Sequence, residues 1–278
     1  MHQANCLNCN AELASVQHFC SNCGQKNPVH RITFGHVLHE FFHAFTHADK
    51  GILFLLKELT LRPGTVAREY VGGKRKKYFN PFTFFLLVMG LFVFSNTMFL
   101  KSDIPAQPDP RVLAQLPTQE AKDSYSGIVI RSQKASHFMS HYSNVVGMVA
   151  VPFLSLLTWL FYRRRGFNYA EHLTGNLLFT SYNNLLFAIL VVPLDRTMTT
   201  PQHHVMLLGS GMLIHAIYLS WGLSGFMQLR GWWNRIKAFL VATFATGLWA
   251  CLSLLGVMMY IMGDLRFWKL FTWMAGKH

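Results

Sequence analysis

The chain has 278 residues, of which 51% are hydrophobic and 13% are charged, and its formal net charge is +13. Soluble domains usually contain about a quarter charged residues, so this composition argues against a soluble protein and for several membrane-spanning helices. The positive charges lie in short segments between apolar stretches rather than along one surface. This distribution argues against nucleic acid as a partner and favours membrane lipids with anionic headgroups.

Near the N-terminus, the chain carries four cysteines in two Cys-x-x-Cys pairs, Cys6 with Cys9 and Cys20 with Cys23. Two such pairs, ten residues apart, can place four thiolates tetrahedrally around one zinc ion. Gly24 follows the second pair and permits the tight turn behind it. We therefore predict a structural zinc ribbon over residues 1–27. Because its thiols must stay reduced, the ribbon also predicts a cytoplasmic N-terminus.

Residues 28–79 are too polar to cross a bilayer and too regularly patterned to be a linker. They predict two amphipathic helices on the cytoplasmic membrane surface, over Thr33–Ala48 and Gly51–Leu61. Arg62-Pro63-Gly64 ends the second helix, and a short helix over Thr65–Val71 leads into a basic turn.

The first of these helices carries a row of histidines. At about 100° per residue, one face collects five polar side chains: His36, His39, Glu40, His43 and His47. Imidazoles four residues apart can share a metal ion, and the Glu-x-x-His spacing occurs in carboxylate-bridged sites of helical bundles. A second metal site would use His36, His39, His43, His47 and Asp49. A catalytic site would combine His39, Glu40, His43 and His172. The alternative is an interfacial helix whose histidines merely form its polar face.

A second candidate site is cationic. Its members are Arg62, Arg68, Lys74, Arg75, Lys76 and Lys77. Next to the rings of Tyr78 and Phe79, and just before an apolar stretch, these cations can bind the phosphate of a lipid headgroup. The alternatives are that the basic run only sets membrane topology, and that Arg62 and Arg68 form structural pairs with Glu58 and Glu69.

Residues 80–262 contain five apolar stretches of about 18–25 residues, the length of a transmembrane helix. They are Pro81–Leu100, Val145–Tyr162, His172–Leu194, Val205–Phe226 and Ala238–Met262. The third stretch carries a polar stripe that lines either a cavity or a contact between helices: His172, Asn176, Thr180 and Asn183, with His215 on the next stretch.

The positive-inside rule places Arg163–Arg165 and Arg230–Lys237 on the cytoplasmic side. It places residues 101–144 in an external loop, expected to be irregular apart from a short helix after Pro117. Residues 263–278 then form an external tail at the membrane interface. The sequence thus predicts an all-α polytopic membrane protein with about five transmembrane helices, an N-terminal zinc ribbon and cytoplasmic interfacial helices.

Several motifs together resemble an uncharacterised bacterial family of inner-membrane proteins with an N-terminal zinc ribbon. They are the cysteine pairs, His-Ala-Phe-Thr-His-Ala-Asp-Lys-Gly at residues 43–51, Arg-Pro-Gly at 62–64, Glu-Tyr at 69–70, and Gly-Lys-Arg-Lys-Lys-Tyr-Phe-Asn-Pro-Phe at 73–82. The resemblance implies a multi-pass protein of the bacterial inner membrane. It brings no reaction, substrate or catalytic residue, because the family is known only as a domain of unknown function.

For function, we expect a site at the cytoplasmic interface that binds or acts on a lipid or another anionic amphiphile. The sequence leaves open whether this site is catalytic. One rival is a non-enzymatic scaffold or assembly factor that docks protein partners through its zinc ribbon. Another is a transporter of a small solute or ion that uses the polar stripe. Nothing in the sequence indicates an oligomeric state.

Overall fold

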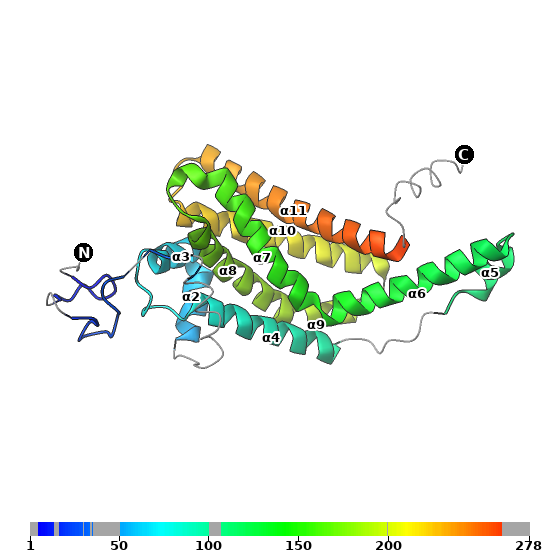
Figure 1. Ribbon diagram of the computed structural model, residues 1–278, viewed down its shortest axis with the longest axis horizontal. Coiled ribbons are helices and arrows are strands. Elements are labelled where there is room, and N and C mark those ends of the chain that lie inside the picture. The colour runs from blue at the N-terminus through cyan, green and yellow to red at the C-terminus, as the bar shows by residue number, and fades with distance from the viewer. Residues whose placement is uncertain are drawn as a thin grey trace.

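The computed structural model describes residues 5–13, 17–29, 31–33, 35, 51–99, 107–198 and 200–262. Within these ranges the regular secondary structure is helical, and the cysteine-containing segment consists of turns and irregular chain with two isolated β-bridges. Figure 1 shows an elongated helical body with the cysteine-containing segment at one end and α5 and α6 projecting at the other. The predicted histidine helix, Thr33–Ala48, and the tail at 263–278 lie outside the described residues.

Two short helices follow the undescribed segment, in agreement with the pattern of residues 51–71. They are α2 (Ile52–Leu61) and α3 (Pro63–Val71). Pro63 opens α3, a position where proline's missing N–H is not needed and its fixed φ suits the helix. Both helices bury apolar side chains, including Leu55, Leu59 and Val66. They pack against the ends of α8 and α10.

Four helical segments are long and apolar enough to cross a membrane: Val145–Arg165, Tyr169–Asp195, Gln202–Phe226 and Trp232–Met262. They belong to α7 (Ser143–Tyr162), α8 (Tyr169–Leu186) with its extension, α10 (Pro201–Phe226) and α11 (Trp232–Met262). The extension of α8 is a π-helical turn, η2 (Phe187–Val191), followed by α9 (Val192–Thr197). The remaining apolar helix, α4 (Pro81–Phe99), is shorter over its apolar part, Pro81–Asn96.

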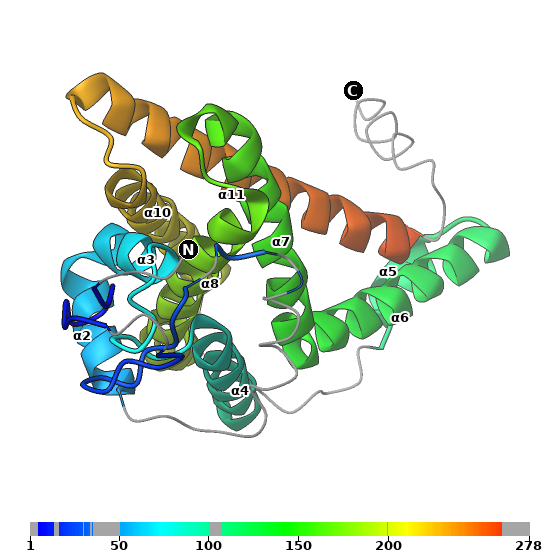
Figure 2. The same ribbon diagram turned by 60° about the vertical axis from the view of Figure 1, so that its left-hand side comes forward.

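Helix α8 is the central element of the body. It contacts α3, α4, α7 and α10, and Figure 2 shows it surrounded by these helices. Its residues from Ala170 to Asn183 are buried. The helix begins with a capping box, in which the Asn168 side chain accepts from the N–H of Glu171 and the Glu171 carboxylate accepts from the N–H of Asn168. This enclosure explains why α8 can carry polar groups that lipid would not accept.

The prediction of a mostly irregular loop over residues 101–144 is wrong for most of its described part. This segment forms α5 (Pro110–Gln115) and the 23-residue α6 (Gln119–His141). The prolines all precede Gln119, and the Thr118 hydroxyl accepts a hydrogen bond from the N–H of Ala121, which caps α6. Helix α6 packs against α7 and α11, so tertiary contacts extend a helix that the local sequence only starts.

Candidate functional site

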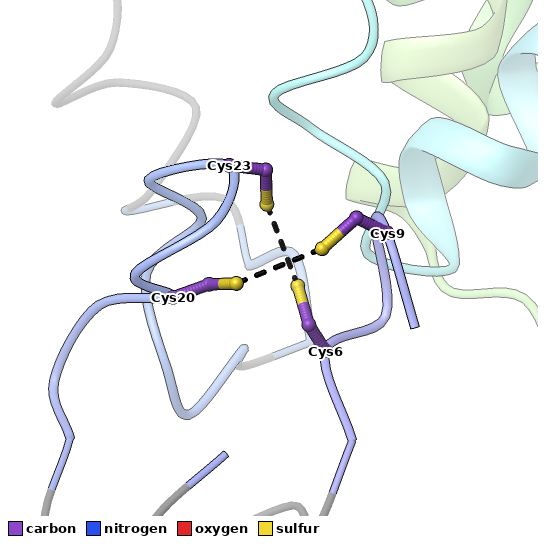
Figure 3. Close-up of side chains that lie close together, drawn as sticks. All are labelled: Cys6, Cys9, Cys20 and Cys23. Carbon is purple, nitrogen blue, oxygen red and sulfur yellow. Dashed lines mark hydrogen bonds between the residues drawn. The ribbon is translucent and has the colours of Figure 1, made fainter. Parts of the chain in front are cut away.

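The four N-terminal cysteines converge on one point, and Figure 3 shows their sulfur atoms directed toward a common centre. The Sγ atoms of Cys6 and Cys23 are 3.6 Å apart, as are those of Cys9 and Cys20. A disulfide would need about 2.05 Å. A regular tetrahedron with metal–sulfur bonds of about 2.3 Å has edges of about 3.8 Å. The cluster therefore fits a single metal ion held by four thiolates.

The two cysteine pairs use the same backbone turn. In the first pair the N–H of Asn10 donates to the carbonyl of Cys6 at 2.8 Å, and in the second the N–H of Gly24 donates to that of Cys20 at 2.8 Å. Both donors have positive φ, 62° for Asn10 and 70° for Gly24. Asparagine tolerates this conformation better than most residues. Both pairs are therefore followed by a residue that permits the turn, and only Gly24 was recognised as such from the sequence.

The cysteine-containing segment contacts the basic turn (residues 73–77) between α3 and α4. Gly73 has φ of 111°, and a Cβ there would lie 2.7 Å from Cδ1 of Leu7, which stands between Cys6 and Cys9. The Gln25 side-chain oxygen accepts a hydrogen bond from the N–H of Lys76 at 3.1 Å. Two residues next to the cysteines, Leu7 and Gln25, therefore already contact another part of the chain.

A second attachment joins the segment after the ribbon to the start of α8. The Arg31 guanidinium forms a two-pronged ion pair with Glu171, at 2.6 Å from Nε and 2.8 Å from Nη2. Asn168 donates its side-chain amide to the carbonyl of Ile32 at 2.9 Å. The same residues that cap α8 thus fix the position of the chain behind the ribbon.

Half of the predicted cationic site is occupied by internal ion pairs. Glu69 receives Lys77 at 2.6 Å and Lys74 at 3.2 Å, and the Tyr78 hydroxyl donates to it at 2.6 Å. Burial of Glu69 opposes its ionisation, but the hydrogen bonds from these three side chains outweigh burial and lower the pKa of Glu69 to about 2. Burial and the neighbouring Glu69 carboxylate raise the pKa of Tyr78.

The other predicted cations differ in their surroundings. Arg62 donates from Nε to Glu58 at 2.6 Å, which confirms the structural-pair alternative for this residue. Lys76 is exposed on the basic turn and Arg75 is half-buried beside it. Arg68 does not pair with a carboxylate among the described residues. It donates to the carbonyl of Phe226 at 3.0 Å instead.

Replacing Glu69 with glutamine should lower the stability of the folded protein by about 1 kcal/mol at neutral pH, because the amide keeps the size but loses the ion pairs. The folded-state pKa of about 2 lies below the ordinary 4.5. The stabilisation is therefore complete above pH 4.5 and is lost as the pH falls toward 2. Thermal unfolding of both proteins should show a difference in melting temperature that shrinks over this range. Glu120→Gln, at an exposed position of α6, is the control.

Arg68 lies at the mouth of a groove of about 690 Å³ between α3 and the α10–α11 turn. One group of lining side chains can bind an anion: Thr65, Arg68, Ser220, Ser224, Gln228, Arg230 and Arg235. The other group is apolar or aromatic: Ile217, Trp221, Leu229 and Phe239. None of the ion pairs among the described residues uses Arg68, Arg230 or Arg235. The groove thus combines an apolar wall with three cations that have no carboxylate partner in the described part of the chain.

A close helix crossing and a tight turn build this groove. Gly64 of α3 lies against the backbone of α10, since a Cβ on Gly64 would be 2.5 Å from the Cα of Gly225. Arg68 follows Gly64 by one helical turn and therefore points along the same face toward the end of α10. Gln228 and Gly231 have positive φ, 49° and 82°, and reverse the chain between α10 and α11.

Sequence reasoning assigns Arg230 and Arg235 only to a cytoplasmic loop. Nothing in the order of residues brings α3 next to the α10–α11 turn, so the shared groove is visible only in the structure. Two exposed tryptophans, Trp232 and Trp233, accompany these arginines and are typical of a membrane interface.

The polar stripe of α8 has two halves. Toward the start of the helix, Nδ1 of His172 lies 3.3 Å from Oγ1 of Thr158, and the Asn176 amide donates to the same oxygen at 3.0 Å. This half makes contacts between helices. Farther along, the Asn183 side-chain nitrogen lies 2.7 Å from Nδ1 of His215, and Thr180 and Asn183 line a cavity. The first half of the stripe therefore makes contacts between helices, whereas the second half both contacts α10 and lines a cavity.

The predicted second metal site and most of the predicted catalytic site cannot be placed. His36, His39, Glu40, His43, His47 and Asp49 lie outside the described residues. His172, the remaining member, is 1% exposed and is enclosed by the rings of Phe167 and Phe226. Within the described part of the chain, the group that could hold a metal ion is the cysteine cluster.

Comparison with known proteins finds a partial match to one family model, for which no activity is known. The profile described as Protein of unknown function (DUF3667) matches residues 49–93. This stretch comprises α2, α3, the basic turn and the first part of α4, and the match fits the predicted resemblance to an uncharacterised family. No curated protein and no solved structure matches the chain.

Proposed function

We propose that the chain is a multi-span protein of the bacterial inner membrane that binds an anionic amphiphile at its cytoplasmic end. The basic groups at the ribbon end of the body support this orientation. Arg163–Arg165, the basic turn over residues 73–77 and the α10–α11 turn all follow or precede apolar helices there, as the positive-inside rule requires of a cytoplasmic face. In this proposal α4 is a fifth span and residues 263–278 form an interfacial tail.

The metal in the cysteine cluster is zinc in this proposal. Four thiolates are the donor set of closed structural zinc sites, and their spacing matches zinc–sulfur bonds. A closed shell of four protein ligands leaves no position for substrate. The ion would therefore stabilise the turns around Asn10 and Gly24 and hold the segment on the basic turn.

The observation that carries the functional proposal is the groove at Arg68, Arg230 and Arg235. Guanidinium groups bind phosphates and carboxylates through two parallel hydrogen bonds, and they are less strongly hydrated than lysine. Trp221 and Phe239 lie in the same groove, where the first carbons of a lipid chain can pack. Charge and shape together suit a ligand with an anionic head and an apolar tail.

This assignment moves the anion site relative to the sequence prediction. Arg62, Lys74 and Lys77 neutralise carboxylates of the chain, whereas Arg68 keeps its predicted role. Binding of this kind requires no catalysis, and the histidine segment would add a reaction only if its metal or acid–base groups reach the bound head. A scaffold function through the ribbon has less support, because Leu7 and Gln25 already contact the basic turn.

The proposal is tested by titrating the full chain, purified in an uncharged detergent, with dioctanoyl phosphatidylglycerol and dioctanoyl phosphatidylcholine. The anionic lipid should bind at least about tenfold more tightly, and the double variant Arg230→Gln/Arg235→Gln should lose that preference. Arg164→Gln, an exposed cation at the same end but outside the groove, is the matched control and should keep it.

Equal binding of the two lipids, or an equal loss in Arg164→Gln, would refute a specific anion site. A competition arm with inorganic phosphate separates two sources of the anion. Weak competition supports a lipid ligand. Full competition by free phosphate at comparable concentration would contradict it.

A further inference from the structure

A second cavity lies inside the helical body, away from the basic groove. It has a volume of about 280 Å³ and is lined by residues of α4, α7, α8, η2, α10 and α11. Apolar side chains form most of its wall, among them Phe92, Leu154 and Trp249. Its polar lining comes from uncharged groups and one histidine: Thr180, Asn183, Asn184, His215 and Thr246. No acidic side chain, lysine or arginine lines it among the described residues.

Two polar atoms in this wall lack a partner within the described structure. They are Oγ1 of Thr180 and Oδ1 of Asn183, on side chains that are 4% and 2% exposed. Leaving such a buried group unbonded costs about 1–3 kcal/mol, so buried polar groups of this kind normally bond to protein, water or ligand. The other amide atom of Asn183 is already engaged with His215.

A larger groove adjoins the cavity. This groove has a volume of about 870 Å³ and lies between α6, α7 and α11, the three helices seen together in Figure 2. Val146 and Trp249 line both spaces. Its wall is apolar or aromatic, with hydroxyl groups on Tyr142 and Tyr260, except for Gln133, Lys134 and His137 on α6 and Ser253 on α11. A small cavity with a few polar groups in its wall therefore adjoins a larger, mostly apolar groove.

A local departure from α-helical geometry marks the inner end of the cavity. The π-helical turn η2 begins at Phe187, which lines the cavity, and π-turns often occur at functional sites. The Phe187 ring packs on Gly211 of α10, where an added Cβ would lie 2.3 Å from the ring. The position of this wall is thus fixed by close packing.

We propose that the cavity binds the hydroxyl head of an uncharged lipid alcohol whose hydrocarbon tail lies in the adjoining groove. A charged head is excluded because no opposite charge lines the cavity, and burying an unpaired charge is very costly. A hydroxyl can donate to Oδ1 of Asn183 and accept from the hydroxyl of Thr180. The hydroxyl also fits if the nitrogen and oxygen of the Asn183 amide are exchanged, because a hydroxyl both donates and accepts. A carbonyl head could only accept.

The experiment compares tritiated farnesol with its methyl ether, which has the same tail but cannot donate a hydrogen bond. The full chain in detergent should bind farnesol about tenfold more tightly than the ether. Thr180→Val and Asn183→Leu should each abolish this preference. Thr174→Val is the matched control, since Thr174 is equally buried on α8 but donates to Ala170 and lies outside the cavity.

Folding is checked on the same proteins without ligand. Thr180→Val should melt at the wild-type temperature or higher, because it replaces an unbonded hydroxyl with a methyl group. Equal binding of alcohol and ether, or an unchanged preference in both cavity variants, would overturn the proposal and indicate that water alone fills the cavity. This site uses an uncharged ligand, so its failure would leave the anionic groove untouched, and the reverse also holds.

Discussion

Gly64→Ala is expected to destabilise the folded protein by about 3 kcal/mol or more. A Cβ at this position would lie 2.4 Å from the carbonyl oxygen of Gly222 and from the backbone nitrogen of Phe226. Because the clashing atoms belong to the backbone of α10, no rotamer change can relieve the overlap. Helix α3 would have to move away from α10.

The measurement is thermal unfolding of the purified protein in detergent. Gly90→Ala is the matched control, since Gly90 lies inside α4 and an added Cβ would meet nothing within 4 Å. The control should melt at or slightly above the wild-type temperature, because alanine favours a helix by up to about 1 kcal/mol. A Gly64→Ala protein that melts like the control would show that α3 and α10 do not cross this closely.

The same variant links packing to the proposed site. Arg68 reaches the groove only because Gly64 allows α3 to lie on α10. Any Gly64→Ala protein that still folds should therefore bind phosphatidylglycerol more weakly than the Gly90→Ala control.

Cys20→Ser is expected to remove the bound metal and to unfold the N-terminal segment. In small zinc domains, a structural zinc ion contributes an apparent folding free energy of about 10–16 kcal/mol. Besides the metal, the described segment is held by a few turn hydrogen bonds, two isolated β-bridges and its contacts with the basic turn, and it contains no helix or extended strand. Cys20 is 2% exposed, so the serine hydroxyl would also be buried without its metal.

Metal analysis of the purified chain should find one zinc per wild-type molecule and almost none in Cys20→Ser. Cys251→Ser is the control, because Cys251 is exposed on α11 and lies outside the cluster. Limited proteolysis should cleave residues 5–29 faster in Cys20→Ser than in the control. Full retention of zinc in Cys20→Ser, or a different metal in the wild type, would contradict the assignment.

The elements that the sequence predicted well are those determined by local patterns. The cysteine spacing indicated the four-thiolate cluster, and Arg62-Pro63-Gly64 indicated the break between two helices, although the second begins at Pro63 rather than at the predicted Thr65. Long apolar runs indicated the four long helices. The sequence predicted only a short helix where α6 extends over 23 residues, because its sequence is polar and its length depends on contacts with α7 and α11 as well as on the Thr118 cap.

The candidate site was only partly predictable, because charge alone does not reveal which cations already have partners. Arg62 and Arg68 look equivalent in the sequence, yet the first pairs with Glu58 and the second lines the groove. Arg230 lines the same groove although it lies 162 positions further along the chain, because α3 crosses α10 next to it. The two halves of the α8 stripe differ for a similar reason. His172 and Asn176 find Thr158 of α7 as a partner, whereas Thr180 and Asn183 lie beyond its reach and line the cavity.

The central claim is that an anionic head binds in the groove at Arg68, Arg230 and Arg235. It is tested most directly by cross-linking the wild-type chain to a phosphatidylglycerol that carries a diazirine in its headgroup, followed by peptide mapping. The account predicts label on peptides containing residues 217–239, with competition by unlabelled phosphatidylglycerol but not by phosphatidylcholine. Label confined to residues 74–77, or label that phosphatidylcholine removes equally well, would contradict it.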